Sequence, residues 1–241
     1  MHRFYVKKID RDYVTISDAE QLHHLKDVLR LKVNDEVTVF DGDGNECVSL
    51  ISEMDKTRAV LAIKATKSSG SKPVKITVAC ALPKKSGMDE IVDSLTQLGV
   101  DTIIPLATAR VIVKLPENKK EARLERWRRI AQSAAQQSQR NDIPLIGPVT
   151  SLEKVVAQSQ VYDLKLILAV YGERKHITEA LASVKPTSIL VLIGPEGDFT
   201  QEEIGLAKSA GFIPVSLGDT VLRVSTAATA VASYIKFCLL G

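Results

Sequence analysis

Two segments in the C-terminal half carry residue types that are suited to holding a ligand. The first, at 193–199, has the sequence IGPEGDF, and the second, at 217–227, has the sequence LGDTVLRVSTA with Arg223 as its one cation. Glycine lets a ligand come close to the backbone, proline stiffens a turn, and a carboxylate accepts hydrogen bonds. A loop as apolar as the second is unusual unless it is buried or covered by a ligand. A plain strand-to-helix turn and a core-lining loop remain the alternatives for the two segments.

The elements that position these segments are strands and helices in alternation. Five apolar stretches are predicted strands: 76–82, 102–106, 164–170, 189–193 and 213–217. Helices are predicted between or after them, at 88–98, 117–139, 173–184, 200–210 and 225–240. Thr200 and Glu203 have capping-box spacing, and Gly99 and Gly211 are typical of helix C-termini. This pattern predicts a mostly parallel α/β sheet covered on both faces, whose ligands bind beyond the carboxyl ends of the strands.

The N-terminal part of the chain has a different pattern. Five short stretches rich in Val, Ile, Phe and Tyr are predicted strands: 3–6, 13–16, 36–40, 47–51 and 59–63. One helix is predicted after the second strand, because Ser17 and Glu20 have capping-box spacing and three leucines follow at helical spacing. The polar segment 67–73 ends in proline and is the predicted linker. We therefore expect two domains, a small barrel or compact sheet at 1–70 and the α/β domain at 73–241.

Composition limits the classes of protein to which the chain can belong. Of its 241 residues, 45% are hydrophobic and 25% are charged, which is typical of a soluble globular protein. The three cysteines are scattered, so a disulfide framework is not expected and a reducing, cytoplasmic compartment is favoured. Because no apolar run approaches the ~18 residues of a membrane span, we expect no association with membranes.

The sequence lacks the residue patterns that are typical of several other functions. The four histidines do not have zinc-ligand spacing, and no Cys-x-x-Cys pair is present. The segment DGDGN at 41–45 resembles the start of a calcium loop, but Glu46 and Ser52 occupy the positions that require glycine and glutamate. Neither a P-loop nor a Gly-x-Ser-x-Gly or Gly-x-Gly-x-x-Gly motif occurs. We therefore expect no metal, and NTPase, hydrolase and Rossmann-type functions are disfavoured.

The two loop motifs together resemble the paired signature of the SPOUT RNA methyltransferases. GPEG at 194–197 is followed about twenty residues later by LGxxVLR at 217–223. More narrowly, the chain resembles the RsmE family, which methylates N3 of a uridine in 16S ribosomal RNA. Further matches to that family lie in order along nearly the whole chain: RFY at 3–5, His24 with VLR at 28–30, ALPK at 81–84, LGV at 98–100 and QQSxR at 136–140.

The resemblance implies a fold, a cofactor and an assembly. The fold is a PUA-like β-barrel for the first domain and an α/β domain with a trefoil knot for the second. The protein would act as a homodimer on 16S rRNA or the small ribosomal subunit, with S-adenosylmethionine (SAM) as methyl donor. By motif position, the cofactor-binding residues would be Val170, Tyr171, Ile193, Gly194, Pro195, Glu196, Gly197, Leu217, Gly218, Val221, Leu222, Arg223, Ser225 and Ala227.

The methylation of uracil N3 requires that its proton leave before the nitrogen can attack. A guanidinium near the uracil oxygens would stabilise the anion that develops. Arg223 is the first candidate for this catalytic role, because its loop also holds the cofactor. Arg140 and Gln137 are the next candidates, from either subunit, although Arg140 also fits a plain helix-end cation.

RNA also needs cations that contact its phosphates. Lys119, Lys120 and Arg123 begin a basic run on the helix predicted at 117–139, and three arginines follow within six residues. Trp127 in this run would either pack in the core or stack on a base, and a solvated helix with internal ion pairs is the alternative for the cations. By resemblance and charge, the RNA-binding candidates are Arg3, His24, Arg30, Lys84 and Arg126.

The chain departs from the usual RsmE pattern at four places. Asp198 stands where glycine commonly follows GPEG, and Ser225 stands where glutamate is usual. Gln97 replaces a common glutamate, and the segment 85–87 lacks the usual Asp-Arg. Two other functions therefore remain open: a SPOUT enzyme that methylates another base or a ribose 2′-hydroxyl, and a ribosome-assembly factor with weak catalysis.

Overall fold

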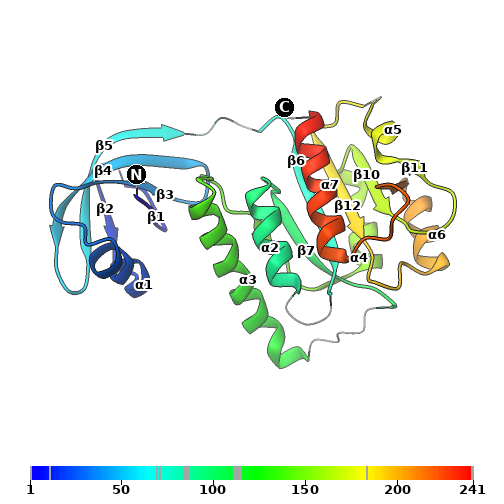
Figure 1. Cartoon of the computed structure of the whole chain (residues 1–241), viewed down its shortest axis with the longest axis horizontal. Helices are drawn as coiled ribbons and strands as arrows, with labels where there is room; N and C mark the ends of the chain where they lie inside the picture. Colours follow the sequence, from blue (N-terminus) through cyan, green and yellow to red (C-terminus); the bar gives the residue numbers. More distant parts are fainter. Residues whose placement is uncertain are drawn as a thin grey trace. The chain divides into compact units, whose positions relative to one another are not determined.

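The computed structural model describes residues 2–10, 12–68, 70, 72–83, 87–110, 116–182 and 184–239 (Figure 1). The chain forms two compact units, Met1–Ser71 with Gln132–Ile143, and Lys72–Ala131 with Pro144–Gly241. The second segment of the first unit includes the last turns of helix α3 (Glu117–Gln137), which the sequence did not indicate. The assignment of 1–70 and 73–241 to separate domains stays a prediction.

The first unit contains one five-stranded sheet. Its strands are β1 (His2–Tyr5), β2 (Tyr13–Ile16), β3 (Glu36–Phe40), β4 (Asn45–Met54) and β5 (Ala59–Ser68), in the order β1-β3-β4-β5-β2. β1 runs parallel to β3, and the other neighbours are antiparallel. β4 and β5 are longer than predicted, because they pair from Asn45 opposite Ser68 to Met54 opposite Ala59. Lys67 and Ser68 therefore belong to β5 and not to a linker.

The N-cap of the helix in this unit lies one residue after the predicted cap, Ser17. In α1 (Ala19–His23) the carboxylate of Asp18, not the Ser17 hydroxyl, accepts the Gln21 N–H, so the predicted capping box was wrong. The Gln21 side chain in turn bonds both the N–H and the carbonyl of Tyr5 in β1, each over 2.9 Å. A π-helical turn, η1 (His24–Val28), continues α1 and buries Leu25 in the core of the sheet.

The described residues of the second unit contain an eight-stranded sheet whose paired strands are all parallel, whereas the sequence predicts five strands in a mostly parallel sheet. Its strands are β6 (Lys75–Ala81), β7 (Thr102–Ala107), β8 (Leu145–Ile146), β9 (Thr150–Ser151), β10 (Leu164–Leu168), β11 (Lys175–His176), β12 (Ser188–Ile193) and β13 (Ile213–Ser216). The order is β11-β13-β10-β12-β6-β7-β8, with β9 also beside β7. The central strands are nearly continuous apolar runs because they are buried on both faces.

Helices cover both faces of this sheet. The helices of the second unit are α2 (Gly87–Gln97), the part of α3 before Gln132, α4 (Leu152–Ala157), the 3₁₀ turn η2 (Ser159–Val161), α5 (Ile177–Ala182), α6 (Gln201–Ser209) and α7 (Val224–Leu239). Leu190 and Leu192 of β12 pack with α4 and α6, and the alternate residues of β12 are buried on the opposite face. α2 and α7 pack against each other, and α7 also contacts β6 and β12 (Figure 1).

The predicted elements of this unit are confirmed with three differences. The stretch 173–184 is a short strand followed by one helix, α5, and not a single helix. α3 ends at Gln137, because Gln139 adopts a φ of 59°. β8, β9 and α4 were not predicted, since two-residue strands leave no periodic signal. The Thr200–Glu203 capping box and the left-handed Gly99 and Gly211 are present.

Among the helices of the described ranges, none has the length and apolar character of a bilayer span. The same ranges contain no cluster of three or more His, Cys, Asp or Glu side chains arranged to hold a metal ion.

Candidate functional site

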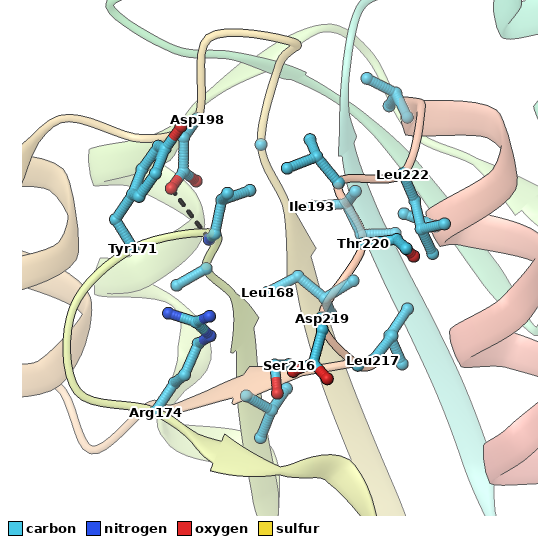
Figure 2. A pocket seen from close by; sticks show the side chains of 18 of the residues that line it. Leu168, Tyr171, Arg174, Ile193, Asp198, Ser216, Leu217, Asp219, Thr220 and Leu222 are labelled. Carbon is cyan, nitrogen blue, oxygen red and sulfur yellow. Dashed lines mark hydrogen bonds between the residues drawn. The ribbon is translucent and has the colours of Figure 1, made fainter.

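A cavity of about 350 Å³ lies at the carboxyl ends of β10, β12 and β13 (Figure 2). Its walls come from three chain segments, 168–174, 193–198 and 215–222, and from the first turn of α7. β10 pairs with both β12 and β13, so the segments that follow these three strands emerge at one edge of the sheet. This is the place where an open parallel sheet binds its ligands.

Most of the predicted cofactor residues line this cavity. They are Val170, Tyr171, Ile193, Gly194, Pro195, Leu217, Gly218, Val221, Leu222 and Ala227. The cavity lining does not include Glu196, Gly197, Arg223 or Ser225, of which the first three are exposed. The structure thus brings the two motifs together around one cavity, and the binding of a cofactor there stays a prediction.

Sequence reasoning missed several residues of the cavity wall. They are Leu168, Ala169, Gly172, Arg174, Asp198, Val215, Ser216, Asp219, Thr220 and Val224. Most of them are neighbours in sequence of predicted residues at the ends of strands. The predicted strand ends could therefore have identified them as cavity residues. Arg174 had no such signal, because the sequence placed it in a helix. It lies in the exposed segment before β11, where its Nη1 donates to the Gly172 carbonyl over 3.2 Å.

The segment after β12 is closely packed and hydrogen-bonded. A Cβ added at Gly194 would lie 3.0 Å from the Phe199 ring, so this position leaves no room for a side chain. Asp198 has a φ of 59° and is buried. Its Oδ2 accepts the Val170 N–H over 2.9 Å (Figure 2). Its Oδ1 accepts the Phe199 N–H, also over 2.9 Å. Asp198 therefore ties the segment after β12 to the segment after β10.

A buried carboxylate also ties this segment to the loop after β7. The Glu203 carboxylate accepts the Thr200 N–H through Oε2 and the Ala109 N–H through Oε1, each over 2.8 Å. Arg110 Nη1 donates to the Gly197 carbonyl over 2.7 Å. The pKa of Glu202 is lowered by its own backbone N–H, by the Thr200 hydroxyl and by the charge of Arg110.

The buried thiol of Cys80 lies close enough to this segment to be affected by the charge of Glu196. Cys80 lies on β6, the strand beside β12, and is fully buried. Burial raises the pKa of the Cys80 thiol well above its ordinary value, and the negative charge of Glu196 raises it further. Cys80 is therefore a neutral core residue and not a nucleophile.

The segment after β13 is open by comparison. Gly218 has a φ of 125°, and Val221 is 66% exposed although it lines the cavity. Arg223 is exposed, and its carbonyl accepts the Ala227 N–H at the start of α7. Within the part of the chain that the structure describes, no side chain from 217 to 223 forms a hydrogen bond or an ion pair. The Arg223 guanidinium is thus available for a ligand or substrate.

The other two catalytic candidates lie in the first unit. Arg140 is nearly buried, and its Nε and Nη2 bond Asp142 Oδ2 over 3.1 and 2.6 Å. Gln137 is exposed at the end of α3. Neither residue lines the cavity, and their catalytic roles stay predictions.

The RNA-binding candidates have very different surroundings. The Arg3 side chain is only 10% exposed, because its guanidinium bonds Glu46, the Arg140 carbonyl and Asn141 and lies 4.4 Å from the Phe40 ring centroid. This geometry gives Arg3 a structural role and leaves little of it for phosphate. His24 and Arg30 are exposed, and Lys84 lies outside the described residues.

Within the second unit, the basic N-terminal part of α3 is held to α2 by an acidic residue. Arg126 Nη2 lies 2.7 Å from Asp89 Oδ2, and Trp127 donates its Nε1–H to the same carboxylate. Trp127 is buried, so it is a core residue and not a stacking platform for a base. Arg126 remains 60% exposed, and the ion pair raises its pKa.

Two family models match the chain and together cover most of it. The model of the RNA methyltransferase domain matches residues 70–236, and the model of the RNA methyltransferase PUA domain matches residues 16–64. A PUA domain joined to a parallel α/β domain with a cavity at its carboxyl edge defines the class, the two-domain RNA methyltransferases.

Relatives and solved structures narrow this class. "Ribosomal RNA small subunit methyltransferase E" of Synechocystis is 36% identical over 228 residues, which cover 94% of this chain and 73% of the relative. The protein of that name in Bacillus subtilis is 31% identical, with 91% and 88% covered. The chain belongs to the ribosomal RNA small subunit methyltransferase E family. The prediction of an RNA methyltransferase of the RsmE family is thereby confirmed.

Two solved structures of similar fold contain the methyl donor. A putative methyltransferase from Legionella pneumophila in complex with SAM is 31% identical, with a TM-score of 0.88 and coverage of 98% of this chain and 97% of that one. The ribosomal RNA small subunit methyltransferase E of Neisseria gonorrhoeae, bound to SAM, is 29% identical, with a TM-score of 0.86 and coverage of 99% and 98%.

Proposed function

We propose that this chain transfers the methyl group of SAM to N3 of a uridine in 16S ribosomal RNA. The observation that carries the proposal is the cavity, because the two family motifs, separated by about twenty residues, both contribute residues to its wall. Family membership supports RNA as the substrate, and the names and ligands of the relatives support 16S rRNA and SAM.

The residues of the cavity fit a methyl donor of this kind. The volume of about 350 Å³ lies in the range of small-molecule sites. Apolar side chains such as Ile193, Leu217 and Leu222 would cover the adenine, and exposed backbone next to Gly194 and Gly218 would contact its polar edge. Charged side chains in the same wall, Arg174 and Asp198, match the charged groups of the methionine part.

The residues of this chain would assist the loss of the proton from N3 of the uracil. When bound, SAM supplies an activated methyl group on a sulfonium, which an aligned nucleophile accepts. The N3 proton must leave, and the uracil oxygens then carry negative charge. Arg223 lies beside the cavity-lining Leu222 and Val224, and its exposed guanidinium would stabilise that charge. Arg140 and Gln137 are the next candidates, contributed by either subunit of a homodimer.

RNA would bind along exposed cations of helix α3. Lys119, Arg123 and Arg129 are exposed there, and Arg126 remains partly free beside Asp89. Such cations contact phosphates without regard to sequence, so binding should weaken steeply as salt rises. His24 and Arg30 of the PUA-like unit are exposed and would contribute phosphate contacts of their own. The target base must leave its stack to reach a methyl donor in the cavity.

The remaining features of the proposal come from the resemblance and from composition. They are the trefoil knot in the second unit, the homodimer, and a cytoplasmic location with the 16S rRNA or the small subunit as partner. The four scattered histidines and three cysteines fit a reaction that uses no metal ion.

The test compares nucleosides of 16S rRNA from cells with and without the gene. Mass spectrometry should show N3-methyluridine in the parent strain, its loss on deletion, and its return when the gene is restored. A ribose-methylated product would assign the enzyme to another RNA position. Unchanged nucleosides, together with RNA binding and no SAM binding in calorimetry, would instead define an assembly factor.

A further inference from the structure

Asp198 is a buried carboxylate in the wall of the cavity. The residue is 5% exposed, yet it lines the cavity together with Val170 and Pro195. Its two oxygens accept backbone N–H groups, from Val170 and Phe199. These donors fix the direction of the carboxylate, but they bring only partial positive charge to it.

No side-chain cation is paired with this carboxylate among the residues that the structure describes. A buried charge without an opposite charge is costly, because it has lost its water. The other charged side chains of the cavity wall, Arg174 and Asp219, are exposed, so water screens their charges. The cavity therefore contains one poorly screened negative charge, and a cation in the cavity is the partner that would compensate it.

The two ligands of a methyltransferase differ in this respect. SAM carries a sulfonium, whose positive charge does not depend on pH. When the methyl group leaves, the electron pair of the S–C bond remains on sulfur, and the product S-adenosylhomocysteine (SAH) carries a neutral thioether. We propose, on the basis of the proposed function, that Asp198 makes this cavity select the cationic donor SAM over its neutral product SAH. Such selection would speed the exchange of product for donor after each turnover.

The backbone conformation at Asp198 is compatible with an aspartate at this position. Its φ of 59° is a left-handed conformation in which glycine is unstrained and aspartate is one of the better-tolerated residues. A glycine at this position would provide no charge and no side-chain bond to Val170. The Asp198 carboxylate therefore adds a buried negative charge to the wall of this cavity.

Two substitutions separate the charge from the structural effects. Asp198→Asn keeps the size of the side chain and one acceptor oxygen, which can still bond the Val170 N–H. It removes the charge and leaves the Phe199 N–H without its side-chain acceptor. Asp198→Gly removes the charge and both side-chain hydrogen bonds. It also removes the conformational strain of a non-glycine residue at a φ of 59°. Asp219→Asn is the matched control, because Asp219 lines the same cavity but is exposed.

The experiment is calorimetric titration of the full-length protein with SAM and with SAH, at one pH and one ionic strength. The ratio of the Kd for SAH to the Kd for SAM should fall on the order of tenfold in Asp198→Asn and in Asp198→Gly. In Asp219→Asn the ratio should change less than about twofold. Thermal unfolding of each variant shows that it is folded.

The proposal about Asp198 is overturned if the ratio in Asp198→Asn stays within about twofold of wild type, or changes no more than in Asp219→Asn. In that case SAM still binds, and the proposed function stands. If the wild-type protein binds neither ligand, the proposed function fails, and the proposal about Asp198 fails with it.

Discussion

The two loops that enclose the cavity are built in different ways. The loop after β12 is fixed by buried polar groups: Asp198 bonds the segment after β10, and Glu203 bonds the loop after β7. Most side chains of the loop after β13 are exposed, and in the described residues none of the side chains from 217 to 223 forms a polar contact within the protein. One wall of the cavity is thus set before any ligand arrives, and the other keeps its polar groups available.

This difference suggests a separate task for each loop. The loop after β12 would hold the methyl donor, and the loop after β13 would act on the RNA base. A preformed wall binds without the entropic cost of ordering, which suits a cofactor that must be held in one position. An exposed guanidinium without an internal partner, such as Arg223, suits a group that acts on the RNA base. Changes in the first loop should therefore affect folding and donor affinity, whereas changes in the second should affect turnover.

The largest effect is expected for Arg223→Ala. The turnover number should fall about 100-fold, because one donor to the developing uracil anion is lost. The Kd for SAM should stay within about twofold, since Arg223 does not line the cavity. Single-turnover methylation of small subunits and calorimetry measure the two quantities.

Arg223→Lys is the control for this substitution. It keeps the charge but not the planar fork, and it should retain an intermediate rate. Unchanged turnover in Arg223→Ala would remove this residue from the mechanism.

The next largest effect is expected for Glu203→Ala. It removes the acceptor of the Thr200 and Ala109 N–H groups, so the free energy of unfolding should fall by about 2 kcal/mol. Denaturant titration measures this change. Glu202→Ala, an exposed neighbour in the same helical turn, should cost well under half as much. Equal losses for the two variants would show that the loop after β12 is not braced through Glu203.

A smaller effect is expected for Gly194→Ala. The added Cβ would lie 3.0 Å from the Phe199 ring, so the loop must shift and the Kd for SAM should rise about tenfold. Gly205→Ala is the control, because nothing lies within 4 Å of its added Cβ on the exposed side of α6. That variant should gain up to about 1 kcal/mol of stability and bind SAM normally. Unaltered SAM binding by Gly194→Ala would argue against a close-packed cofactor wall.

The smallest effect is expected for Val221→Ser in the open loop. Val221 is 66% exposed, so the free energy of unfolding should change by less than about 0.5 kcal/mol. The Kd for SAM should rise about threefold, because the ligand would cover this side chain. Loss of stability above that level would contradict the description of this loop as open.

Local signals in the sequence predicted much of the fold and of the cavity wall. The apolar run of β12 and the Thr200–Glu203 box fixed the position of the first loop, and both are present. The bonds that brace it could not be predicted, because Val170 and Ala109 lie 28 and 94 residues from their partners. These bonds exist only once β10, β12 and β7 have paired into one sheet.

The errors in the first unit have the same origin. Ser17 and Asp18 are both acceptable caps, and the bonds of Gln21 to Tyr5 in β1 accompany the choice of Asp18. Arg3 was a plausible RNA contact by charge, but Glu46, 43 residues away, pairs with it. In both cases a partner distant in the sequence decided between two local possibilities.

The central claim is that the cavity at the carboxyl edge of the parallel sheet binds the methyl donor. The most direct test is to soak crystals of the protein with SAH and to determine the structure. We expect density for the ligand in the cavity between the segments 193–198 and 217–222, with the sulfur facing the side on which Arg223 lies. Ligand bound elsewhere on the protein, or a cavity that stays empty while calorimetry shows binding, would contradict the account.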